Sequence, residues 1–598
     1  MSNMDKITGA HLLPDYITPE RLRKHWDRAK SGRQRATKLF ELLNAFDEGK
    51  QWDVLGVKMP PYQLKPNTNW VKKTKNDIVN SVYAGGYVGN VLPIRAEDKE
   101  TADLLNRYLE YVFDKTDAYL MQLYAGERAA LLNIGITQVG WDSTVISGTK
   151  DALSKGEVEF KNIDPLSFYC DPSATHPLKG QYIIIAEKMP LTELEAEEQW
   201  SDRLKTYRQL YESANRAEEF EKYGLKGDVH PEDDTVSLMT YYIRKVNEKG
   251  GVKIDQIITI GGDFILEVKE NIKPNTYPFA ILYSNLPTKD LYGISTPHDI
   301  MSLQLAVNMI DSIEATHAYK TQNPAKLIDK ASGINVRSFA KHGNDPDKVW
   351  VVNGNPSEVI RYVQPYQLSP TLPQLQARFT QMIPTITELD AAYLGRDTGS
   401  IQTTGGVEGQ MARVSMSDNT RVALLEDYVK QMTKLVIQYY KEFGDKRWFR
   451  YNLSPDSSEV DFVSIDFEEM DTGVEFDYTV HVSPQLPKNK ARMAEWANII
   501  MEKQMQYQPE IQLMSPTEWL SYQDAPQKHI IYNRIKAEEQ QNTMDEILGT
   551  IGGFAAMYQQ GLSPEDSVQI LAEEKEMMKR GNPLGNTANA NSFQQRQM

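Results

Sequence analysis

Residues 292–327 read YGISTPHDIMSLQLAVNMIDSIEATHAYKTQNPAKL, and residues 371–395 read TLPQLQARFTQMIPTITELDAAYLG. The first stretch begins a helix near Thr296, because Pro297 falls in the opening turn and Asp299 lies close to the positive helix end. Both stretches repeat apolar residues at intervals of three and four, which is typical of helices packed along one face. The sequence therefore predicts two helices separated by an insert of roughly 50 residues, too small for a free-standing enzyme but sufficient for an interaction module.

The first helix carries two stripes. Its apolar stripe consists of Ile300, Leu303, Val307 and Ile310, and the polar stripe beside it consists of Gln304, Asn308 and Asp311. A helix with two such stripes is expected to have two different neighbours.

The second helix has one narrow apolar seam. Its members follow a four-three alternation and are Leu375, Phe379, Met382, Ile386, Leu389 and Tyr393. This alternation favours packing against another helix. Pro384 falls within the seam and is expected to kink the helix.

A pliable loop and a very long helix follow. The segment DTGSIQTTGGVEGQ, residues 397–410, is small and polar and predicts an exposed loop. From Gly406 to Phe443 the apolar spacing of a helix returns, interrupted only at Asp418. One continuous helix over these residues would span roughly 57 Å.

The rest of the chain mixes helical and strand patterns. Helices are expected over residues 18–50, 69–83 and 96–133, and a Pro-rich linker lies between the first two. Strand alternation appears in residues 134–185 and 236–283 and returns after the long helix, in RWFRYNLS, EVDFVSIDFEEM and GVEFDYTVHVSP. The fold class is therefore α+β, and we expect the last strands to rejoin the earlier block.

This order of elements resembles the portal proteins of tailed double-stranded DNA bacteriophages. In that family a stem helix, a clip insert, a second stem helix, a tunnel loop and a long kinked helix follow one another. Two local stretches, YGISTPHDIMSLQLAVNMIDS and FKNIDPLSFYCDPSA, are also similar to the family's helix start and Asp-Pro strand. Neither is a catalytic signature, and with the helix pair they cover about half of the chain.

The resemblance implies a division of the chain. The expected parts are a wing of N-terminal helices plus α+β block (1–290), stem helix 1 (291–322), a small α/β clip (323–370), stem helix 2 (371–395), the tunnel loop (396–410), a long wing helix with returning strands (411–486), a helical crown (487–580) and a disordered tail (581–598). Short strands are expected in the clip at INVRSF, KVWVVNG and VIRYVQPY. No C-terminal barrel is expected, because no long heptad region closes the sequence.

Composition limits the possible functions. Hydrophobic residues make up 40% and charged residues 25%, which are ordinary globular values. The only cysteine, Cys170, excludes an internal disulfide and a four-cysteine zinc site. No apolar run approaches the ~18 residues of a membrane span. The net charge of -16 argues against a surface that holds nucleic acid tightly, yet it suits a conduit along which DNA slides.

Three groups of residues are candidate sites under the portal interpretation. The tunnel loop that would line the channel comprises Arg396, Asp397, Thr398, Gly399, Ser400, Ile401, Gln402, Thr403, Thr404, Gly405 and Gly406. The clip residues that would contact the terminase are Lys326, Lys330, Arg337, Lys341 and Trp350. The stem candidates are Gln304, Asn308 and Asp311. One of the two stripes of their helix is expected to pack within the subunit, and the other to face a neighbouring subunit or the channel.

The resemblance also implies partners and a location. They are a dodecameric ring of this chain, double-stranded DNA read without regard to sequence, the terminase large subunit, head-tail adaptors, and the major capsid and scaffolding proteins. The protein would reside at the capsid portal vertex of the virion, after assembly in the host bacterial cytoplasm. Neither a cofactor nor a membrane partner is expected.

An enzymatic alternative stays open at this point. A metal-assisted nuclease or another phage DNA-processing enzyme could use carboxylates such as Glu468, Glu469 and Asp471. Asp164, Cys170, Asp171 and His176 could similarly be drawn as a metal cluster, although Asp-Pro pairs are ordinary turn chemistry. The nucleotide-binding loop G-x-x-x-x-G-K-[ST] and the H-E-x-x-H and G-x-S-x-G motifs are absent from the sequence, which favours a structural protein over an enzyme.

Overall fold

A computed structural model gives the fold of this chain. It describes residues 12–211, 235–387, 404–452, 460–467, 476–479, 497–504, 516, 519–520 and 534, except for gaps at 55, 57, 96–97, 150–151, 197, 247–250, 263, 289, 344 and 364–365. The chain forms two compact units, one of residues 1–447 with 465–485 and the other of 448–464 with 486–598. The predicted crown lies largely outside the described residues, and the predicted tail lies wholly outside them.

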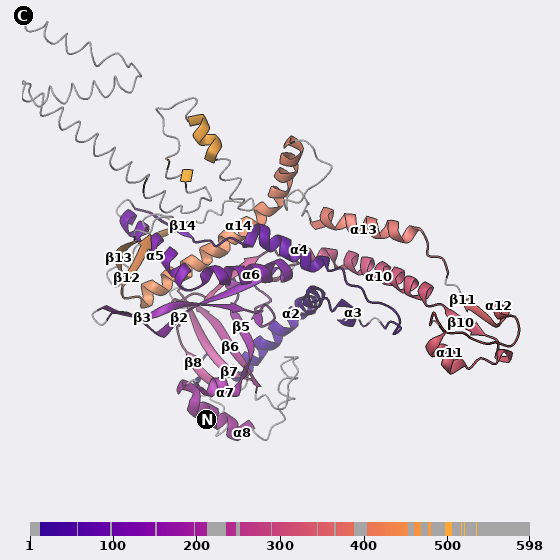
Figure 1. The fold of residues 1–598 in the computed structure, drawn as a ribbon. Helices are drawn as coiled ribbons and strands as arrows, with labels where there is room; N and C mark the ends of the chain where they lie inside the picture. The colour runs from indigo at the N-terminus through magenta and orange to yellow at the C-terminus, as the bar shows by residue number, and fades with distance from the viewer. Residues whose placement is uncertain are drawn as a thin grey trace, which may run out of the picture. The chain divides into compact units, whose positions relative to one another are not determined.

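The helices and strands follow one another as Figure 1 shows. The helices are α2 (Pro19–Asp47), α3 (Gln51–Val54), α4 (Trp70–Ile78), α5 (Lys99–Lys115), α6 (Ala118–Leu132), α7 (Leu191–Ala196), α8 (Ser201–Tyr211), α10 (Thr296–Gln322), α11 (Val336–His342), α12 (Pro356–Val359), α13 (Thr371–Thr387) and α14 (Thr404–Phe443). A π-helical turn spans Val79–Tyr83, and 3-10 turns span Pro177–Lys179, Glu198–Trp200 and Lys330–Ser332.

Fourteen labelled strands accompany these helices in the described residues. They are β1 (Asn90–Pro93), β2 (Ile134–Thr149), β3 (Ala152–Ile163), β4 (Phe168–Cys170), β5 (Tyr182–Pro190), β6 (Thr235–Val246), β7 (Val252–Ile260), β8 (Phe264–Lys269), β9 (Phe279–Tyr283), β10 (Ala325–Ile328), β11 (Ile360–Val363), β12 (Lys446–Asn452), β13 (Val460–Asp466) and β14 (Phe476–Thr479). The α+β class predicted from the sequence is confirmed.

Two antiparallel sheets organise the first unit. One has the strand order β3-β2-β9 and the other the order β4-β5-β6-β7-β8. The alternation read in residues 236–268 is confirmed as β6, β7 and β8, with the last two strands separated by Gly261 and Gly262, both at positive φ. The late strand β14 pairs antiparallel with β1. The chain therefore returns at β14 to a region that it left early. The expectation that the last strands rejoin the earlier α+β block is wrong for β12 and β13, which pair with each other.

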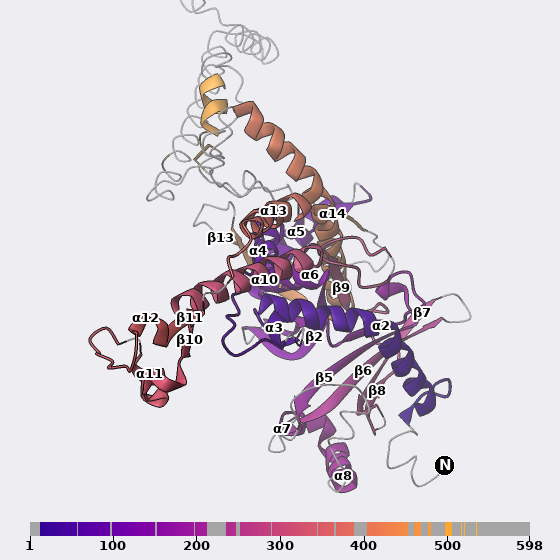
Figure 2. The ribbon, with the colours of Figure 1, turned by 90° about the vertical axis from the view of Figure 1, so that its right-hand side faces the viewer.

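Helix α2 covers the five-stranded sheet, as Figure 2 shows. Its first half packs Leu22, Trp26 and Ala29 against one face of β5, β6 and β7. Its second half contributes Phe40 and Leu43 to a second core, shared with the opposite sheet face and with β2 and β9. A single long helix thus joins the cores on both faces of the sheet.

Helix α14 packs against the three-stranded sheet. The hydroxyls of Tyr428 and Thr137 lie 2.7 Å apart in a buried hydrogen bond. The backbone N–H of Ile281, on the edge strand β9, donates to Gln431 Oε1 at 2.9 Å. Because α14 satisfies an edge-strand N–H that would otherwise be unpaired, the sheet edge is covered rather than left open.

The helical pattern of residues 96–133 is interrupted. Asp117 has a left-handed φ of 53°, which separates α5 from α6, and Asn133 with a φ of 72° ends α6. Both residues belong to the small group of side chains that adopt this conformation readily. Hydrophobic spacing does not report such a local break, because the apolar positions continue on both sides of it.

Candidate functional site: the helical arm and its terminal module

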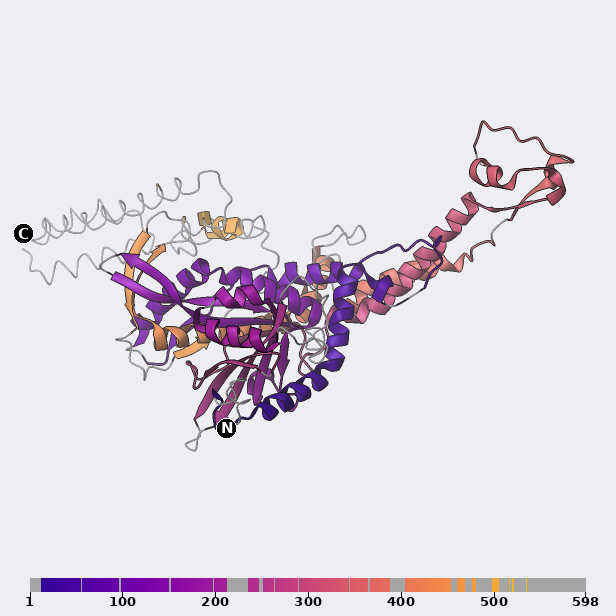
Figure 3. The ribbon, with the colours of Figure 1, turned by 90° about the horizontal axis from the view of Figure 1, so that it is seen from below.

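Helices α10 and α13 lie side by side and lead to a small module, as seen in Figure 1 and Figure 3. We call this helix pair the helical arm and residues 323–370 the terminal module. The observed start of α10 at Thr296 confirms the sequence prediction. The long helix predicted over residues 406–443 is likewise confirmed as α14, which is 40 residues long.

The base of α10 is locked to the rest of the first unit by Asn133. Its side-chain Nδ2 donates to the carbonyls of Asn285 and Tyr292, both at 3.0 Å. Gly293 follows with a φ of +70°, and a Cβ placed there would lie 2.2 Å from Asn133 Nδ2. The YG pair at the start of this stretch therefore has a physical reason, since only glycine tolerates both the conformation and the close approach.

The two stretches that carry the family resemblance touch one another at this base. Cys170 Sγ donates to Tyr292 Oη at 3.4 Å, and both side chains are buried. Burial raises the pKa of the Cys170 thiol to about 11 and the pKa of Tyr292 well above its usual value. The contact is therefore between two neutral groups, as suits a structural bond rather than a reactive thiol.

The polar stripe of α10 binds the Pro-rich linker of the same chain. Asn308 Oδ1 accepts from the backbone N–H of Thr68 in the linker at 2.9 Å, and Gln304 Oε1 accepts from that of Val71 in the first turn of α4 at 2.8 Å. One turn beyond Asn308, Ser312 Oγ donates to the Leu64 carbonyl at 2.6 Å. The extended linker has no ladder partner of its own, so the helix stripe supplies its hydrogen bonds.

Both stripes of α10 are therefore covered within the chain. Gln304 and Asn308 have no exposed surface, and Ile300, Val307 and Ile310 are buried as well. The expectation that one of these stripes faces a neighbouring subunit or the channel is wrong. The third stem residue, Asp311, is half-buried and accepts hydrogen bonds from Gln376 of α13 and from Thr68.

The exposed surface of α10 is a third face that the sequence analysis did not identify. Met309 is 44% and Ile313 43% exposed. On α13, Leu375, Met382 and Ile386 are 38 to 40% exposed, whereas Ile383 and Thr387 are buried. The predicted seam therefore does not form the contact between the two helices. The buried positions are shifted by one residue. Of the four seam residues that the structure describes, three are exposed and Phe379 is half-buried, while Leu389 and Tyr393 lie outside the described residues.

The terminal module has a small core of its own. Phe339 of α11 is buried, and its ring meets Trp350 edge-to-face at a centroid distance of 5.0 Å. The stretch INVRSF, predicted as a strand, begins α11 instead, because Asn335 Oδ1 accepts from the backbone N–H groups of Arg337 and Ser338 as a helix cap. The strand predicted in VIRYVQPY is confirmed as β11, paired with β10.

The five predicted clip residues fall into two groups, those that contact the module core and those that are exposed. Lys326 lies with its Nζ 5.0 Å from the Phe339 ring centroid, and Trp350 packs in the module core. Lys330, Arg337 and Lys341 are exposed. Of the five predicted residues, only these three basic side chains are exposed.

Large apolar side chains are unusually exposed on the module. Val349, Val351 and Tyr366 are 86%, 89% and 97% exposed. Exposed apolar residues that gather on a small module are typical of a surface that another molecule covers.

Comparison with known proteins gives the family. The family model described as "Phage P22-like portal protein" matches residues 21–580. The chain belongs to this portal protein family. Among solved structures, a chain of "Neck of empty GTA particle computed with C6 symmetry" is similar at 11% identity and a TM-score of 0.33, over 76% of this chain and 90% of that one. No curated protein matches the chain.

Membership of the portal family supports a capsid portal role in a phage particle. The family is structural rather than enzymatic. In the part of the chain that the structure describes, no helix is both long and apolar enough to cross a membrane.

Most of the predicted tunnel loop lies outside the described residues. This applies to Arg396, Asp397, Thr398, Gly399, Ser400, Ile401, Gln402 and Thr403. Thr404, Gly405 and Gly406 are the first residues of α14, so they are helical and not part of a loop. Two glycines cost about 1 kcal/mol each in a helix. The apolar spacing that resumes at Val407 favours extending α14 through them despite this cost.

The side chains considered for a metal cluster each serve local structure in the portal subunit. Asp164 and Asp171 accept from backbone N–H groups two residues ahead. His176 Nδ1 accepts from the N–H of Leu178 and caps a 3-10 turn, while Cys170 binds Tyr292. Glu468, Glu469 and Asp471, considered for nuclease chemistry, lie outside the described residues.

Proposed function

We propose that this portal protein assembles into a closed ring that serves as the channel for packaging and ejecting double-stranded DNA. The resemblance noted in the sequence implies twelve subunits. A ring requires heterologous contacts, in which each subunit uses two different faces.

The observation that carries the proposal is the exposed apolar seam of the helical arm. Leu375, Met382 and Ile386 repeat on one side of α13, and Met309 and Ile313 repeat on α10. When such a helix face is buried against a neighbour, the contact is stabilised by about 25 cal/mol for each Å² of apolar surface removed from water. Copies of the same chain are the neighbours that a ring provides.

We further propose that the helical arm is the stem and that the terminal module is the clip. On this assignment the two sheets with α2, α6 and α14 belong to the wing, residues 396–403 form the tunnel loop, and residues 487–580 form the crown. Arg396 at the edge of the loop and Asp397 within it nearly balance in charge. Transient, sequence-blind contact with DNA phosphates fits such a collar better than tight binding.

The clip is proposed to dock the terminase large subunit during packaging and the head-tail adaptors afterwards. The exposed charges of Lys330, Arg337 and Lys341 and the exposed side chains of Val349 and Val351 would supply the contacts. Apolar anchors surrounded by charge are typical of the centre and rim of a protein interface. Major capsid and scaffolding proteins would surround the ring.

The assembly test compares two substitutions at exposed positions of α13, one in the apolar seam and one on a different side of the helix. Ile386→Arg places a charge in the seam, and Gln374→Arg places the same charge at an exposed polar position. Light scattering should give a ring near twelve chains of 68.2 kDa, about 820 kDa, for the wild type and Gln374→Arg, and smaller species for Ile386→Arg. Only monomers or dimers of wild type at micromolar concentration, at every salt tested, would overturn the proposal and favour the nuclease alternative.

A further inference from the structure

Two cavities lie between the sheets of the first unit, on the same face of the five-stranded sheet. Tyr242 of β6 and Phe279 of β9 meet edge-to-face with centroids 5.1 Å apart. Tyr242 lines one cavity and Phe279 lines the other. Because side chains alternate along a strand, Thr240, Tyr242 and Arg244 share this face. The aromatic contact therefore separates the two cavities.

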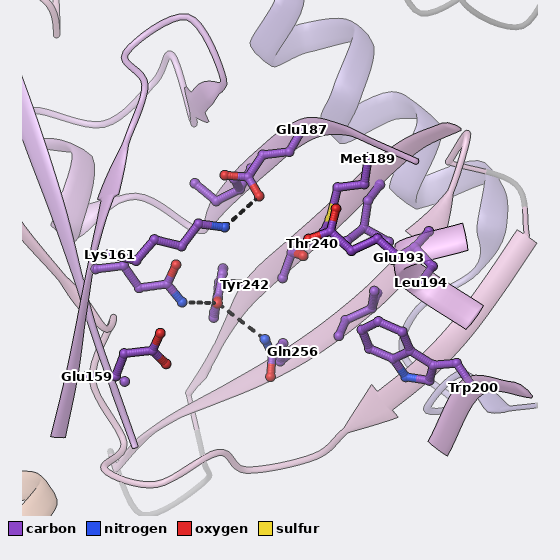
Figure 4. A pocket seen from close by; sticks show the side chains of 15 residues that line it. Glu159, Lys161, Glu187, Met189, Glu193, Leu194, Trp200, Thr240, Tyr242 and Gln256 are labelled. Carbon is purple, nitrogen blue, oxygen red and sulfur yellow. Dashed lines mark hydrogen bonds and ion pairs between the residues drawn. The ribbon is translucent and has the colours of Figure 1, made fainter. Parts of the chain in front are cut away.

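The first cavity is acidic, and Figure 4 shows its lining side chains. Its volume is about 290 Å³, and its charged residues are Glu159, Glu187, Glu193 and Lys161. Lys161 pairs with Glu187 at 2.8 Å across the gap between the sheets. The hydroxyl of Tyr242 at the back accepts from Gln138 and Gln256. Internal partners therefore occupy much of this lining.

The second cavity is basic. Its volume is about 360 Å³, and its lining contains Lys179, Arg244 and Lys434 but no carboxylate. Among the described residues these three cations form no ion pair. Three unpaired cations at one cavity are notable in a chain whose net charge is -16.

Nearby carboxylates are already engaged elsewhere. Asp171 accepts from Ser173 and Gln181, Asp427 accepts from Gln431 Nε2 at 2.6 Å, and Glu442 pairs with Lys273 at 2.6 Å. The positive charge of the cavity is therefore not balanced by direct contacts from these neighbours.

Two polar atoms on the cavity residues lack any hydrogen-bond partner. They are Arg244 Nε and Asn275 Oδ1, and both are buried. Elsewhere on the guanidinium, Nη1 donates a long hydrogen bond of 3.4 Å to the backbone carbonyl of Lys179. A buried donor left unpaired costs about 1–3 kcal/mol, so a bound acceptor would recover this free energy.

The rest of the lining is apolar or amide-bearing. Val252, Ile254, Phe279 and Leu435 offer carbon surface, and Gln431 and Gln438 border it. A concave site with an apolar floor and a few converging polar groups is typical of small-molecule binding, and its volume falls in the usual range of roughly 300–1,000 Å³.

We propose that the basic cavity is a binding site for a small organic oxyanion with an apolar body. The apolar body lies against Ile254, Phe279 and Leu435. The oxyanion accepts from Arg244 Nε, with Lys179 and Lys434 beside it. A hydroxyl or amide N–H on the ligand donates to Asn275 Oδ1. Both a carboxylate and a phosphate ester satisfy this pattern.

The test measures binding to the full chain by isothermal titration calorimetry with three probes of the same aromatic body. These are 1-naphthyl phosphate, 1-naphthoate and neutral 1-naphthol. We expect one molecule of an anionic probe per chain and at least tenfold weaker binding of 1-naphthol. The tighter of the two anions identifies the oxyanion class. If neutral 1-naphthol bound as tightly as the anionic probes, binding would depend on apolar contact alone, and the proposal would be overturned.

Matched variants locate the site. Lys434→Gln and Lys179→Gln change exposed side chains, so they preserve folding and should each weaken the anionic probe about threefold to tenfold. Arg244→Gln should weaken it more. The control Lys253→Gln removes the same charge from β7 but on the opposite sheet face from Val252 and Ile254, and it should leave the affinity unchanged.

A filled-cavity variant separates this site from binding elsewhere on the chain. Val252→Trp adds bulk at the end of β7 without changing charge and should abolish binding of the anionic probe. Circular dichroism checks that each variant is folded. Binding that survives both Val252→Trp and Lys434→Gln would place the probe elsewhere and overturn the assignment. Ring assembly is a separate readout, so failure here leaves the proposed portal ring untouched.

Discussion

The sheets of the first unit and the helical arm differ in how completely the chain itself buries their residues. The five-stranded sheet is covered on both faces by helices and by the other sheet, and most residues of its central strand β6 are buried. On α13, by contrast, Ile383 and Thr387 are the only buried residues among 17. The sheets are complete within one chain, whereas the arm has a face that the chain itself does not cover. Under the proposed function, stability and assembly therefore depend on different regions.

The largest loss of stability should follow from breaking a buried ion pair beside the sheets. Glu157 is buried with Lys115 Nζ at 2.5 Å and Arg447 Nη1 at 3.3 Å, and Tyr440 also donates to it. Arg447→Met should lower the free energy of unfolding by about 3 kcal/mol, because it leaves a buried carboxylate under-compensated. Urea denaturation measures this loss.

The matched control for this substitution lies in the terminal module. Arg361→Met changes an exposed arginine and should alter the free energy of unfolding by less than about 0.5 kcal/mol. If Arg447→Met and Arg361→Met lowered the free energy of unfolding equally, the idea that stability resides in the sheets rather than in the arm and its module would be contradicted.

A pH-dependent loss is expected at the sheet face that α2 covers. Burial, with a contribution from Arg21, lowers the pKa of His25 from 6.5 to about 4. The folded state thus favours neutral His25, and stability should fall as pH decreases from 6.5 to 4 and level off below, by at most about 3 kcal/mol. Denaturation at several pH values should show this slope in the wild type and a smaller one in His25→Phe. An identical slope in both would assign it to other groups.

A moderate loss is expected where α10 of the arm binds α3 and the first turn of α4. Gln304→Leu removes the acceptor of the Val71 N–H and a donor to Gln51, so unfolding should become about 1–3 kcal/mol easier. The control Gln374→Leu makes the same change at an exposed position of α13. Thermal denaturation of both variants measures the difference, and a control as damaging as Gln304→Leu would show that these contacts of Gln304 are unimportant.

The smallest global effect is expected in the terminal module. Phe339→Ala removes the centre of the module core, including the contact with Trp350. Because this core is separate from the sheets, the free energy of global unfolding should change by less than about 0.5 kcal/mol while the module itself loses protection. Hydrogen exchange resolved along the sequence tests this. Loss of protection that spreads into β5–β8 would mean that the module and sheets unfold as one.

Sequence patterns predicted the long elements and missed the local ones. The start of α10 and the full length of α14 followed from apolar spacing and proline position, which act within one helix. The interruption at Asp117 and the helical cap at Asn335 depend on the conformation of a single residue, which spacing does not encode. The seam of α13 was placed one residue away from its contact, because spacing reports a face but not the partner that covers it.

The role of the polar stripe could have been predicted more fully. Gln304, Asn308, Ser312 and Thr316 recur every fourth residue, and a Pro-rich linker with unpaired backbone groups lies earlier in the chain. A stripe of hydrogen-bonding side chains and a segment that lacks partners are complementary. The basic cavity could not be found this way, because Lys179, Arg244, Asn275 and Lys434 are brought together only by the packing of two sheets and α14.

The pairing of β1 with β14 has a consequence for synthesis. Pro93 cannot pair until its partner Phe476, about 380 residues later in the chain, has been synthesised. A ribosome that adds ~5–20 residues each second needs roughly 20–80 s for this. During this interval β1 is an open edge, and Leu92 on it remains 45% exposed even when the chain is complete. A nascent chain is thus open to wrong pairing at β1, and a chain truncated before residue 476 would carry this defect permanently.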